Sequence, residues 1–386
     1  MVFIFWIMRT FLLCSIVCLA FSGLLFSQEN TTNFLFYGKE VSCYLNMNDP
    51  IGDSVEINSF WNSLKTHDQQ IIDSLYSKKE QYNLNDWGFY MLVKSTIEQS
   101  ISNEQLAFIA TCYYLNRAGY RSKIALSQSN KIILLLQSDD LILSSDIVND
   151  GKYNYYVFGN ENGESLSVLE MDYREDGKGL SLNFDVPVNL SGATLEKQLK
   201  FWYKCRRYKL SISLDSSLIA FYNDYPQMDL GNYFNTPISS NLEESLFNAL
   251  WGTMVEKTEI EKAKYLLKFC QKAFKHKKDI RAYGESRSLF CEETLFYPFS
   301  DCEDRAILYA QLIKLFTDIP VIGVCYPEHV VTAIAIDDDR PNLLFNKSID
   351  RAQERYFHAD PTSKGLKIGH VRPKFSNRTP RIIEID

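Results

Sequence analysis

The spacing of apolar and polar residues predicts helices first and strands afterwards in the N-terminal part of the chain. Apolar residues recur at helical spacing between residues 55 and 118, and two shorter runs then follow across the turn Gln128-Ser-Asn130. The pattern predicts helices over 55–77, 86–99 and 104–118, and strands over 122–127, 131–137 and 153–158. This order indicates an N-terminal domain of α/β character.

The character of the chain changes between residues 164 and 225. Short strand-like runs are separated by turn residues such as Glu175-Asp-Gly-Lys-Gly179, and a Pro- and Asn-containing connector follows at 225–237. The runs cover 165–172, 180–186, 195–203, 208–214 and 218–222. We expect a small β-rich module here.

The last 150 residues return to long helices followed by strands. Asn241 is a candidate cap for a helix over 242–254, and Thr258 with Glu261 fits a capping box that opens a second helix. A third helix begins near Ser300 and is apolar around most of its circumference, which is typical of a helix inside a domain. Strands are predicted over 321–326, 329–336 and 355–360, so the fold class expected for the chain is α+β.

The first 27 residues have the features of an export signal. Arg9 supplies a positive charge, residues 10–26 are apolar, and Ser27 is a small residue before a polar stretch. An uncleaved membrane anchor is the alternative, because the apolar run is long for a signal. Either interpretation predicts an exported protein, periplasmic or at the cell surface.

Charge and cysteine content limit the classes of macromolecule and metal ion that the chain is expected to bind. Without Arg9 the chain has 41 − 1 = 40 basic against 48 acidic residues, a net charge of −8, and no clustered basic surface is expected. Nucleic acid and anionic lipid are therefore unfavoured partners. The seven cysteines after the signal are widely spaced, which does not fit a zinc site, and Asp337-Asp-Asp339 lacks the glycine and spacing of a calcium loop. No metal or cofactor is predicted.

Three residues form the candidate catalytic set. Cys302 follows Ser300, which with Glu303 fits a capping box, so Cys302 would be the second residue of a helix whose dipole favours a thiolate. His329 begins a strand and can serve as the base, and Asp360 ends a later strand and can orient the histidine. Each has a plainer interpretation: a core cysteine, a half-buried histidine and a turn aspartate.

Neighbouring residues complicate this interpretation. The carboxylates around Cys302 oppose thiolate formation, and His358 is predicted on the same strand face as Asp360. His67 and His276 are expected on polar helical faces and His370 in the tail. The backbone N–H of Cys302 is the expected oxyanion donor, with the side chains of Tyr283 and Tyr297 as further candidates.

The surroundings of these residues resemble the transglutaminase-like superfamily, which shares the papain-like cysteine-protease core. The resemblance rests on Ser-Asp-Cys302-Glu-Asp-Arg-Ala, Tyr-Pro-Glu-His329-Val and His-Ala-Asp360-Pro-Thr, and covers about residues 240–370. Residues 274–297 are similar to the run before the cysteine in exported bacterial members, as found in Bacteroidetes. His358-Ala359 departs from the pattern, because other members often have apolar residues or Cys there.

The resemblance implies a helix bundle packed on an antiparallel sheet, and acyl transfer on peptide or amide bonds through a Cys-His-Asp triad and a thioester. Hydrolysis by a protease or amidase is favoured over crosslinking. The alternative is a non-catalytic cell-envelope protein that uses the same module to bind a peptide or glycan.

The N-terminal region is a candidate second copy of this fold. Shifting the chain by 199 residues places Cys302 on Asn103 and His329 on Asn130, and overlays the apolar helix and the first strand. The copy would lack both nucleophile and base. The predicted division is a signal at 1–27, an N-terminal α/β domain at 28–160, a β-rich module and connector at 161–237, and a transglutaminase-like domain at 238–386.

Overall fold

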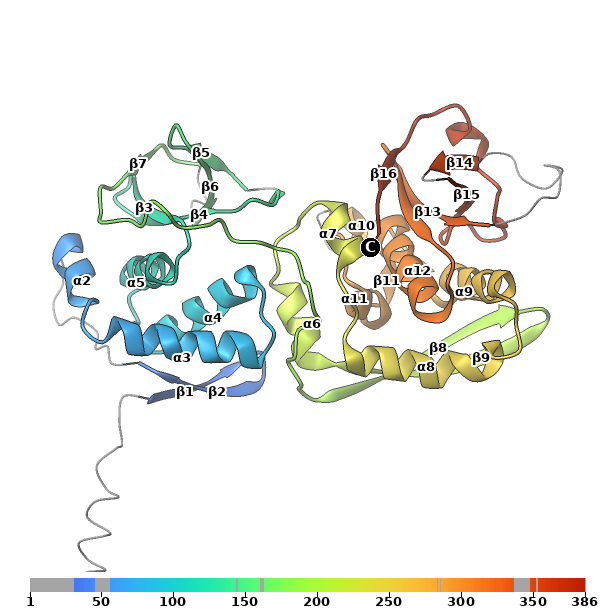
Figure 1. The fold of residues 1–386 in the computed structure, drawn as a ribbon, viewed down its shortest axis with the longest axis horizontal. Coiled ribbons are helices and arrows are strands. Elements are labelled where there is room, and N and C mark those ends of the chain that lie inside the picture. The colour runs from blue at the N-terminus through green and yellow to red at the C-terminus, as the bar shows by residue number, and fades with distance from the viewer. Residues whose placement is uncertain are drawn as a thin grey trace, which may run out of the picture.

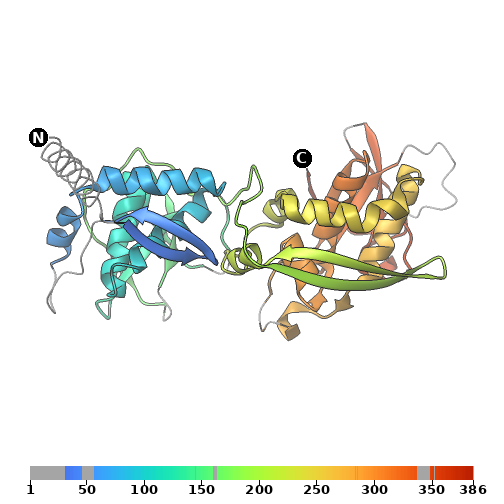
Figure 2. The same cartoon turned by 90° about the horizontal axis from the view of Figure 1, so that it is seen from below.

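The computed structural model describes residues 31–45, 56–143, 145–159, 163–282, 284, 286–336, 348–351 and 353–385. Helices and antiparallel sheets alternate, which confirms the α+β class. The chain forms two lobes side by side along its long axis (Figures 1 and 2). Within the described residues, no helix has both the length and the apolar character needed to span a bilayer.

The N-terminal lobe packs helices between a hairpin and a five-stranded sheet. The hairpin joins β1 (Thr31–Phe36) to β2 (Lys39–Tyr44). The helices are α2 (Ile57–Ser63), α3 (Asp68–Gln81), α4 (Asp86–Glu98) and α5 (Glu104–Arg117). The sheet has the order β5-β6-β4-β3-β7, with β3 (Ser122–Ser127), β4 (Ile132–Gln137), β5 (Ile147–Asn149), β6 (Asn154–Phe158) and β7 (Leu166–Val168).

The C-terminal lobe has the same plan. A long hairpin joins β8 (Thr194–Tyr203) to β9 (Arg206–Asp215). The helices are α6 (Ser216–Asn223), α7 (Leu230–Asn235), α8 (Ser240–Met254), α9 (Glu259–Ala273), α10 (Asp279–Ala282), α11 (Cys291–Phe296) and α12 (Cys302–Phe316). A short parallel pair joins β10 (Lys275–His276) to β11 (Phe299–Ser300).

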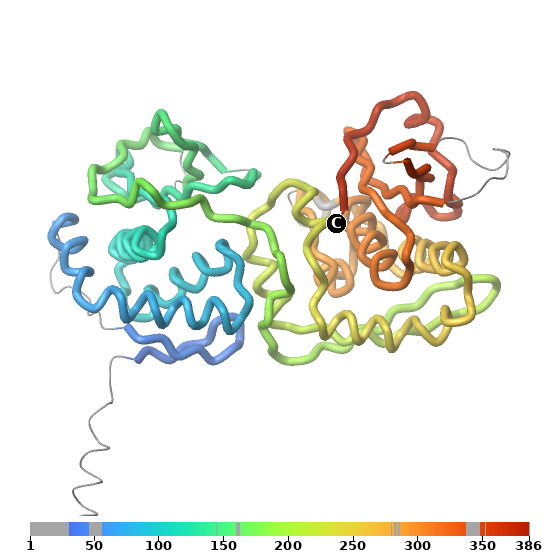
Figure 3. Tube along the Cα trace, in the orientation of Figure 1, coloured from blue at the N-terminus to red at the C-terminus, as the bar shows by residue number. Residues whose placement is uncertain are grey.

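The second five-stranded sheet has the order β14-β15-β13-β12-β16. Its strands are β12 (Val321–Tyr326), β13 (His329–Ala335), β14 (Ser348–Arg351), β15 (Glu354–Ala359) and β16 (Arg381–Ile383), and a 3-10 turn, η1 (Pro373–Phe375), precedes β16. Replacing β3, β4, β5, β6 and β7 by β12, β13, β14, β15 and β16 converts one sheet order into the other. Hairpin, helices and sheet thus recur in the same sequence in both lobes, as the trace in Figure 3 shows.

Several predicted elements differ from the observed ones. The stretch 55–77 contains two helices, because the chain turns at His67 with a φ of 62°. Residues 218–222, predicted as a strand, belong to helix α6, because Asp215 accepts hydrogen bonds from the backbone of Ser217 and Leu218 and caps it. Residues 180–186 form no strand. The predicted β-rich module divides between the lobes: β7 joins the N-terminal sheet, and β8 and β9 pack on α8 and α9.

The helix caps also refine the predictions. Thr258 and Glu261 form the expected capping box at α9. Helix α8 begins two residues earlier than predicted, because Ser239 rather than Asn241 caps it through a bond from the Leu242 N–H. Such caps stabilise a helix by about 1 kcal/mol.

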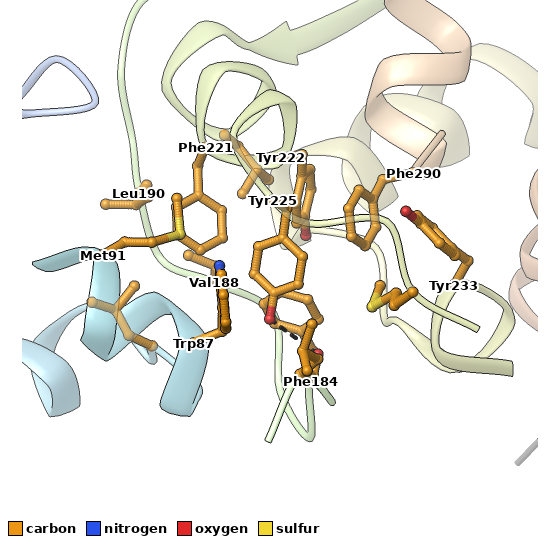
Figure 4. Close-up of a cluster of buried hydrophobic side chains, with 14 of the residues drawn as sticks. Trp87, Met91, Phe184, Val188, Leu190, Phe221, Tyr222, Tyr225, Tyr233 and Phe290 are labelled. Carbon is orange, nitrogen blue, oxygen red and sulfur yellow. Dashed lines mark hydrogen bonds between the residues drawn. The ribbon is translucent and has the colours of Figure 1, made fainter. Parts of the chain in front are cut away.

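An aromatic cluster joins the two lobes (Figure 4). Trp87 comes from α4 of the N-terminal lobe, while Tyr222 on α6 stacks on Phe290, with ring centroids 4.0 Å apart. Phe184 contacts both Tyr225 and Phe290 at 5.1 and 6.0 Å. Since these rings are buried, the lobes share one continuous apolar core.

Candidate active site

The three predicted catalytic residues meet where β13 begins and β15 ends. Cys302 is the first residue of α12, and its sulfur lies at the backbone N–H of Val330, the residue after His329. Asp360 directly follows the last residue of β15, which pairs with β13. The helix terminus and the two strand ends therefore bring Cys302, His329 and Asp360 to one edge of the sheet.

His329 and Asp360 form a buried pair. The Nε2 atom of His329 lies 2.9 Å from Oδ2 of Asp360, and both side chains are at most 6% exposed. The ring of His329 stacks on Phe375 with an interplanar angle of 10°, which fixes its orientation. Because Nε2 is used by the carboxylate, Nδ1 is the ring nitrogen that remains for proton transfer.

Asp360 is held by several further donors. Its Oδ1 accepts the backbone N–H groups of Thr362 and Ser363, and its Oδ2 accepts the Ser363 hydroxyl and lies 3.2 Å from Nε of Arg372. Burial alone would raise the pKa of this carboxyl, but the bond and charge of His329, together with Ser363, lower it to about 2. Asp360 is therefore ionised at neutral pH and can stabilise a protonated His329.

The environment of Cys302 differs from the predicted one. Burial raises the pKa of its thiol, the carboxylates of Glu303 and Asp301 raise it further, and the Val330 N–H opposes them. The thiol donates to Oε2 of Glu303 at 3.0 Å. The expectation of a thiolate near neutral pH is thus wrong for this conformation, because desolvation and the adjacent carboxylates outweigh the helix dipole.

The helix start is shifted by one residue from the predicted one. Asp301 is the N-cap and Cys302 the first helical residue, while Oδ2 of Asp304 accepts the Asp301 N–H at 2.9 Å. The Ser300 hydroxyl instead accepts a bond from Nε of Arg305, whose side chain is fully buried. The predicted box of Ser300 with Glu303 is therefore replaced by one of Asp301 with Asp304.

Two buried side chains behind the site position its backbone. Nε2 of Gln271, on α9, donates to the carbonyl of Asp360 at 2.8 Å. The other Oδ of Asp304 accepts the N–H of Leu289, which ties the segment before α11 to the start of α12. Both bonds hold the edge at which the three candidate residues meet.

The remaining predicted residues have other partners. Nε2 of His358 lies 2.9 Å from the hydroxyl of Tyr326, so this histidine pairs with β12. The Tyr297 hydroxyl donates to Oδ1 of Asn223 on α6, which assigns it to packing between helices. Tyr283 and the run 337–339 lie outside the described residues. The backbone N–H of Cys302 remains the oxyanion donor expected from its place at the helix start.

Sequence reasoning misplaced His276. It lies on β10, opposite Ser300 of β11 and thus beside the residues that lead into Cys302, not on a helical face. Burial and the charge of Arg305 lower its pKa, while Asp301 and the backbone of Ser300 act in the opposite direction. Its isolated two-residue strand has no periodic pattern from which it could have been predicted.

The same location in the N-terminal lobe has different side chains. The β3–β4 turn is one residue longer than the β12–β13 turn. The Ser127 N–H donates to the carbonyl of Lys131, so Lys131 is the first residue after the turn that pairs with β3, as His329 is the first that pairs with β12. Lys131 rather than Asn130 therefore lies at the position of His329. The strand pairing places Gly159 at the position of Asp360. The N–H of Ile132, which follows Lys131, donates to Oε1 of Gln105. In the C-terminal lobe the corresponding N–H, that of Val330, faces the sulfur of Cys302.

The site includes one set of side chains able to face a common ion. Ligand atoms of Asp301, Cys302 and Glu303 lie within 4.8 Å of one another. Three donors from consecutive residues fall short of the four that a structural zinc site uses. The seven cysteines of the described residues all carry free thiols, and Cys205 is the exposed one among them.

Comparisons of this chain with protein-family models and with curated proteins yield no match.

Proposed function

We propose that the chain is an exported thiol enzyme of the transglutaminase-like kind, acting on peptide or amide bonds. The observation that carries the proposal is the convergence of Cys302, His329 and Asp360 at one sheet edge, with His329 bonded to Asp360 through Nε2. A thiol beside a histidine that is oriented by a carboxylate is the arrangement that thiol acyl transfer requires.

The proposed reaction begins with rotation of the Cys302 side chain from Glu303 toward Nδ1 of His329. His329 takes the thiol proton as sulfur attacks the amide carbonyl, and the N–H of Cys302 stabilises the oxyanion. The C–N bond then breaks, and the amine leaves with the proton from His329. Water, activated by His329, hydrolyses the thioester and releases the acid; an amine in place of water would give crosslinking.

The raised pKa of Cys302 explains why the proton must pass to His329 during the attack. A thiol that donates to Glu303 is a poor nucleophile at rest, since the thiolate is the reactive form. The same observation favours a second candidate, a non-catalytic cell-envelope protein that binds peptide or glycan through this module. The two candidates differ in whether Cys302 ever forms a covalent bond to an acyl group.

The N-terminal lobe is, in this proposal, an inactive copy of the same fold. Its sheet has the corresponding strand order, but the first helical residue, Glu104, and Lys131 and Gly159 offer neither a thiol nor an imidazole at the corresponding positions. Gln105 fills the place of the nucleophile through its bond to Ile132. The lobe would then support the catalytic lobe and its substrate without reacting.

A peptide assay tests the proposal. Glutaminyl peptides are incubated with the protein with and without a fluorescent primary amine, and ammonia, cleaved peptide and amine adduct are measured. We expect products that disappear in Cys302→Ala and in His329→Ala, whereas Cys205→Ser, which removes the exposed thiol, retains them. Product formation that survives Cys302→Ala would contradict the enzyme proposal.

A further inference from the structure

The hairpin β8–β9 carries a surface that the proposed site does not use. Its strands pair over ten residues each, from Thr194↔Asp215 to Tyr203↔Arg206. The turn at its tip consists of Lys204 and Cys205, with φ values of 45° and 62°. Two consecutive residues with positive φ make the tight turn that matches the twist of an antiparallel pair.

The inner face of the hairpin holds it firmly against α9. Phe201 contacts Tyr265 and Phe269 at 5.4 and 5.5 Å between ring centroids, and Tyr203 contacts Tyr265 at 5.2 Å. Lys272 donates to the carbonyl of Trp202 at 3.0 Å, close to the tip. The tip is therefore a packed element, and its outer side chains have a fixed location.

The outer face and tip concentrate positive charge around one exposed tryptophan. Residues 200–209 hold five cations and no carboxylate, in a chain with a net charge of −7. Trp202 is 55% exposed. The exposed side chains are Lys200, Trp202, Lys204, Arg206, Arg207 and Lys209. This basic tip corrects the expectation that the chain has no clustered basic surface.

The cations of the basic tip form no close ion pairs with described residues, although Lys204 is near enough to Glu261 on α9 to add to the effect of Thr258, whose hydrogen bonds lower the pKa of that carboxyl. Among the described residues, none of the tip's five cations has a carboxylate within the 4.0 Å of an ion pair. Arg206 lies over Tyr208 and Lys204 over Tyr203 instead. Positive charge continues onto α9. Burial is the main cause that lowers the pKa of Lys268 there, and the nearby charge of Lys272 lowers it further. Glu196, nearer the base of the hairpin, is bonded to Ser211 and Ser213.

The basic tip lies at the far end of the C-terminal lobe, at the opposite end of the long axis from β1, where the chain enters the structure (Figures 1 and 2). Both hairpins nevertheless lie along the same long side of the molecule. Strand β1 begins on that side with Thr31, and Leu35 on its outer face is 70% exposed. In the sequence, the apolar run 10–26 precedes β1 by only a few residues. If that run were placed in a bilayer, the tip would reach the membrane with this long side lying along its surface.

We propose that the basic tip docks on an anionic membrane surface, with Trp202 in the interfacial layer and the flanking cations on lipid headgroups. Tryptophan is enriched at the membrane–water interface, and each Lys or Arg near an anionic surface contributes attraction. A soluble polyanion would match the cations but leaves the exposed indole without a role. The exposed Leu35 and the tip lie on the same long side of the molecule, so both can contact a membrane on which that side lies.

Cys205 provides a reporter at the tip. The full-length chain, with Cys14 and Cys18 replaced by serine, is labelled there with an environment-sensitive fluorophore, because Cys205 is the exposed thiol among the described cysteines. It is then incorporated into vesicles of phosphatidylcholine alone or of phosphatidylcholine with phosphatidylglycerol. We expect a blue shift in the anionic vesicles that salt suppresses; a run 10–26 inserted in the bilayer would hold the chain equally in both kinds of vesicle and would not by itself produce this difference.

Two charge-reversal variants make the test specific. Arg206→Glu combined with Arg207→Glu removes two cations from the tip and adds two anions, and should weaken tip association by more than the roughly 30-fold expected for loss of the two cations alone. Lys131→Glu combined with Lys152→Glu makes the same net change on exposed residues of the opposite edge and should leave the shift intact. Trp202→Ala should reduce the blue shift while the salt dependence persists.

Two outcomes would overturn the proposal. One is equal emission in neutral and anionic vesicles, or an equal response from both charge-reversal variants. The other is an emission that shifts when a soluble polyanion such as heparin is added but does not change with anionic vesicles. That result would assign the surface to a soluble partner.

Discussion

The contact between Cys302 and Glu303 leads to the sharpest prediction. Their thiol and carboxylate atoms are 3.0 Å apart. At that distance a unit charge opposes the thiolate by ~1.4 kcal/mol even at the dielectric constant of bulk water, and by more in a partly buried site. Glu303→Gln removes the charge and keeps a hydrogen-bond acceptor of the same shape. Since one pH unit corresponds to about 1.4 kcal/mol, the ionisation midpoint of Cys302 should fall by at least one unit.

Alkylation by iodoacetamide, quantified for the Cys302 peptide across pH, measures this midpoint. The rate at neutral pH should rise roughly three- to fourfold, because a lower pKa gives more thiolate but also a weaker nucleophile. Asp318→Asn is the matched control, since it removes an exposed carboxylate just beyond the other end of the same helix. An unchanged midpoint in Glu303→Gln, or an equal change in Asp318→Asn, would refute the electrostatic reasoning.

Three further variants test how the site is supported. Asp360→Asn should lower the free energy of unfolding by roughly 2 kcal/mol at pH 7. The reason is that a carboxyl whose pKa is about 2 in the folded protein stabilises the fold above its ordinary pKa, and this stabilisation is lost as the pH falls through about 2. Urea unfolding should therefore give different stabilities for the two proteins at pH 7 and similar ones in acid. Asp304→Ala leaves the buried N–H groups of Asp301 and Leu289 unpaired, and chemical denaturation should show a loss of about 2–4 kcal/mol, while Asp304→Asn should lose less. Gly323→Ala should lower the stability measured by thermal unfolding by about 1–3 kcal/mol, because the new Cβ would lie 3.0 Å from Cβ of Ile383 and 3.1 Å from the Phe234 ring. Gly252→Ala is the control, since its Cβ would enter open space and should not destabilise the fold.

Much of the secondary structure of both sheets followed from the sequence. The apolar helix before the first strand is buried, as its all-round hydrophobicity predicted, and the strands at 321–326 and 329–335 have nearly the predicted bounds. The strand predicted over 218–222 was wrong, because the apolar residues of this run suit a strand or a helix equally. The capping signal Asp215-Ser-Ser217 favours the helix and outweighs the strand-like apolar pattern.

The sequence predicted three candidate residues that the structure brings together, but it did not predict their electrostatics. Chain order and strand ends were enough to select Cys302, His329 and Asp360. The thiol's bond to Glu303 depends on side-chain rotamers, and the use of Ser300 by Arg305 depends on a buried arginine, so neither is visible as a pattern. The cations of the basic tip are contiguous in the sequence, but their importance arises only from the hairpin that exposes them.

Acylation of Cys302 tests the central claim most directly. The protein is mixed with p-nitrophenyl acetate, nitrophenol release is followed, and the acetylated peptide is identified by mass spectrometry. The account predicts a burst of nitrophenol with acetyl on Cys302, slowed strongly in His329→Ala and less in Asp360→Asn. Acetylation of Cys302 at the same rate in wild type and His329→Ala, or acetyl on Cys205 alone, would contradict it.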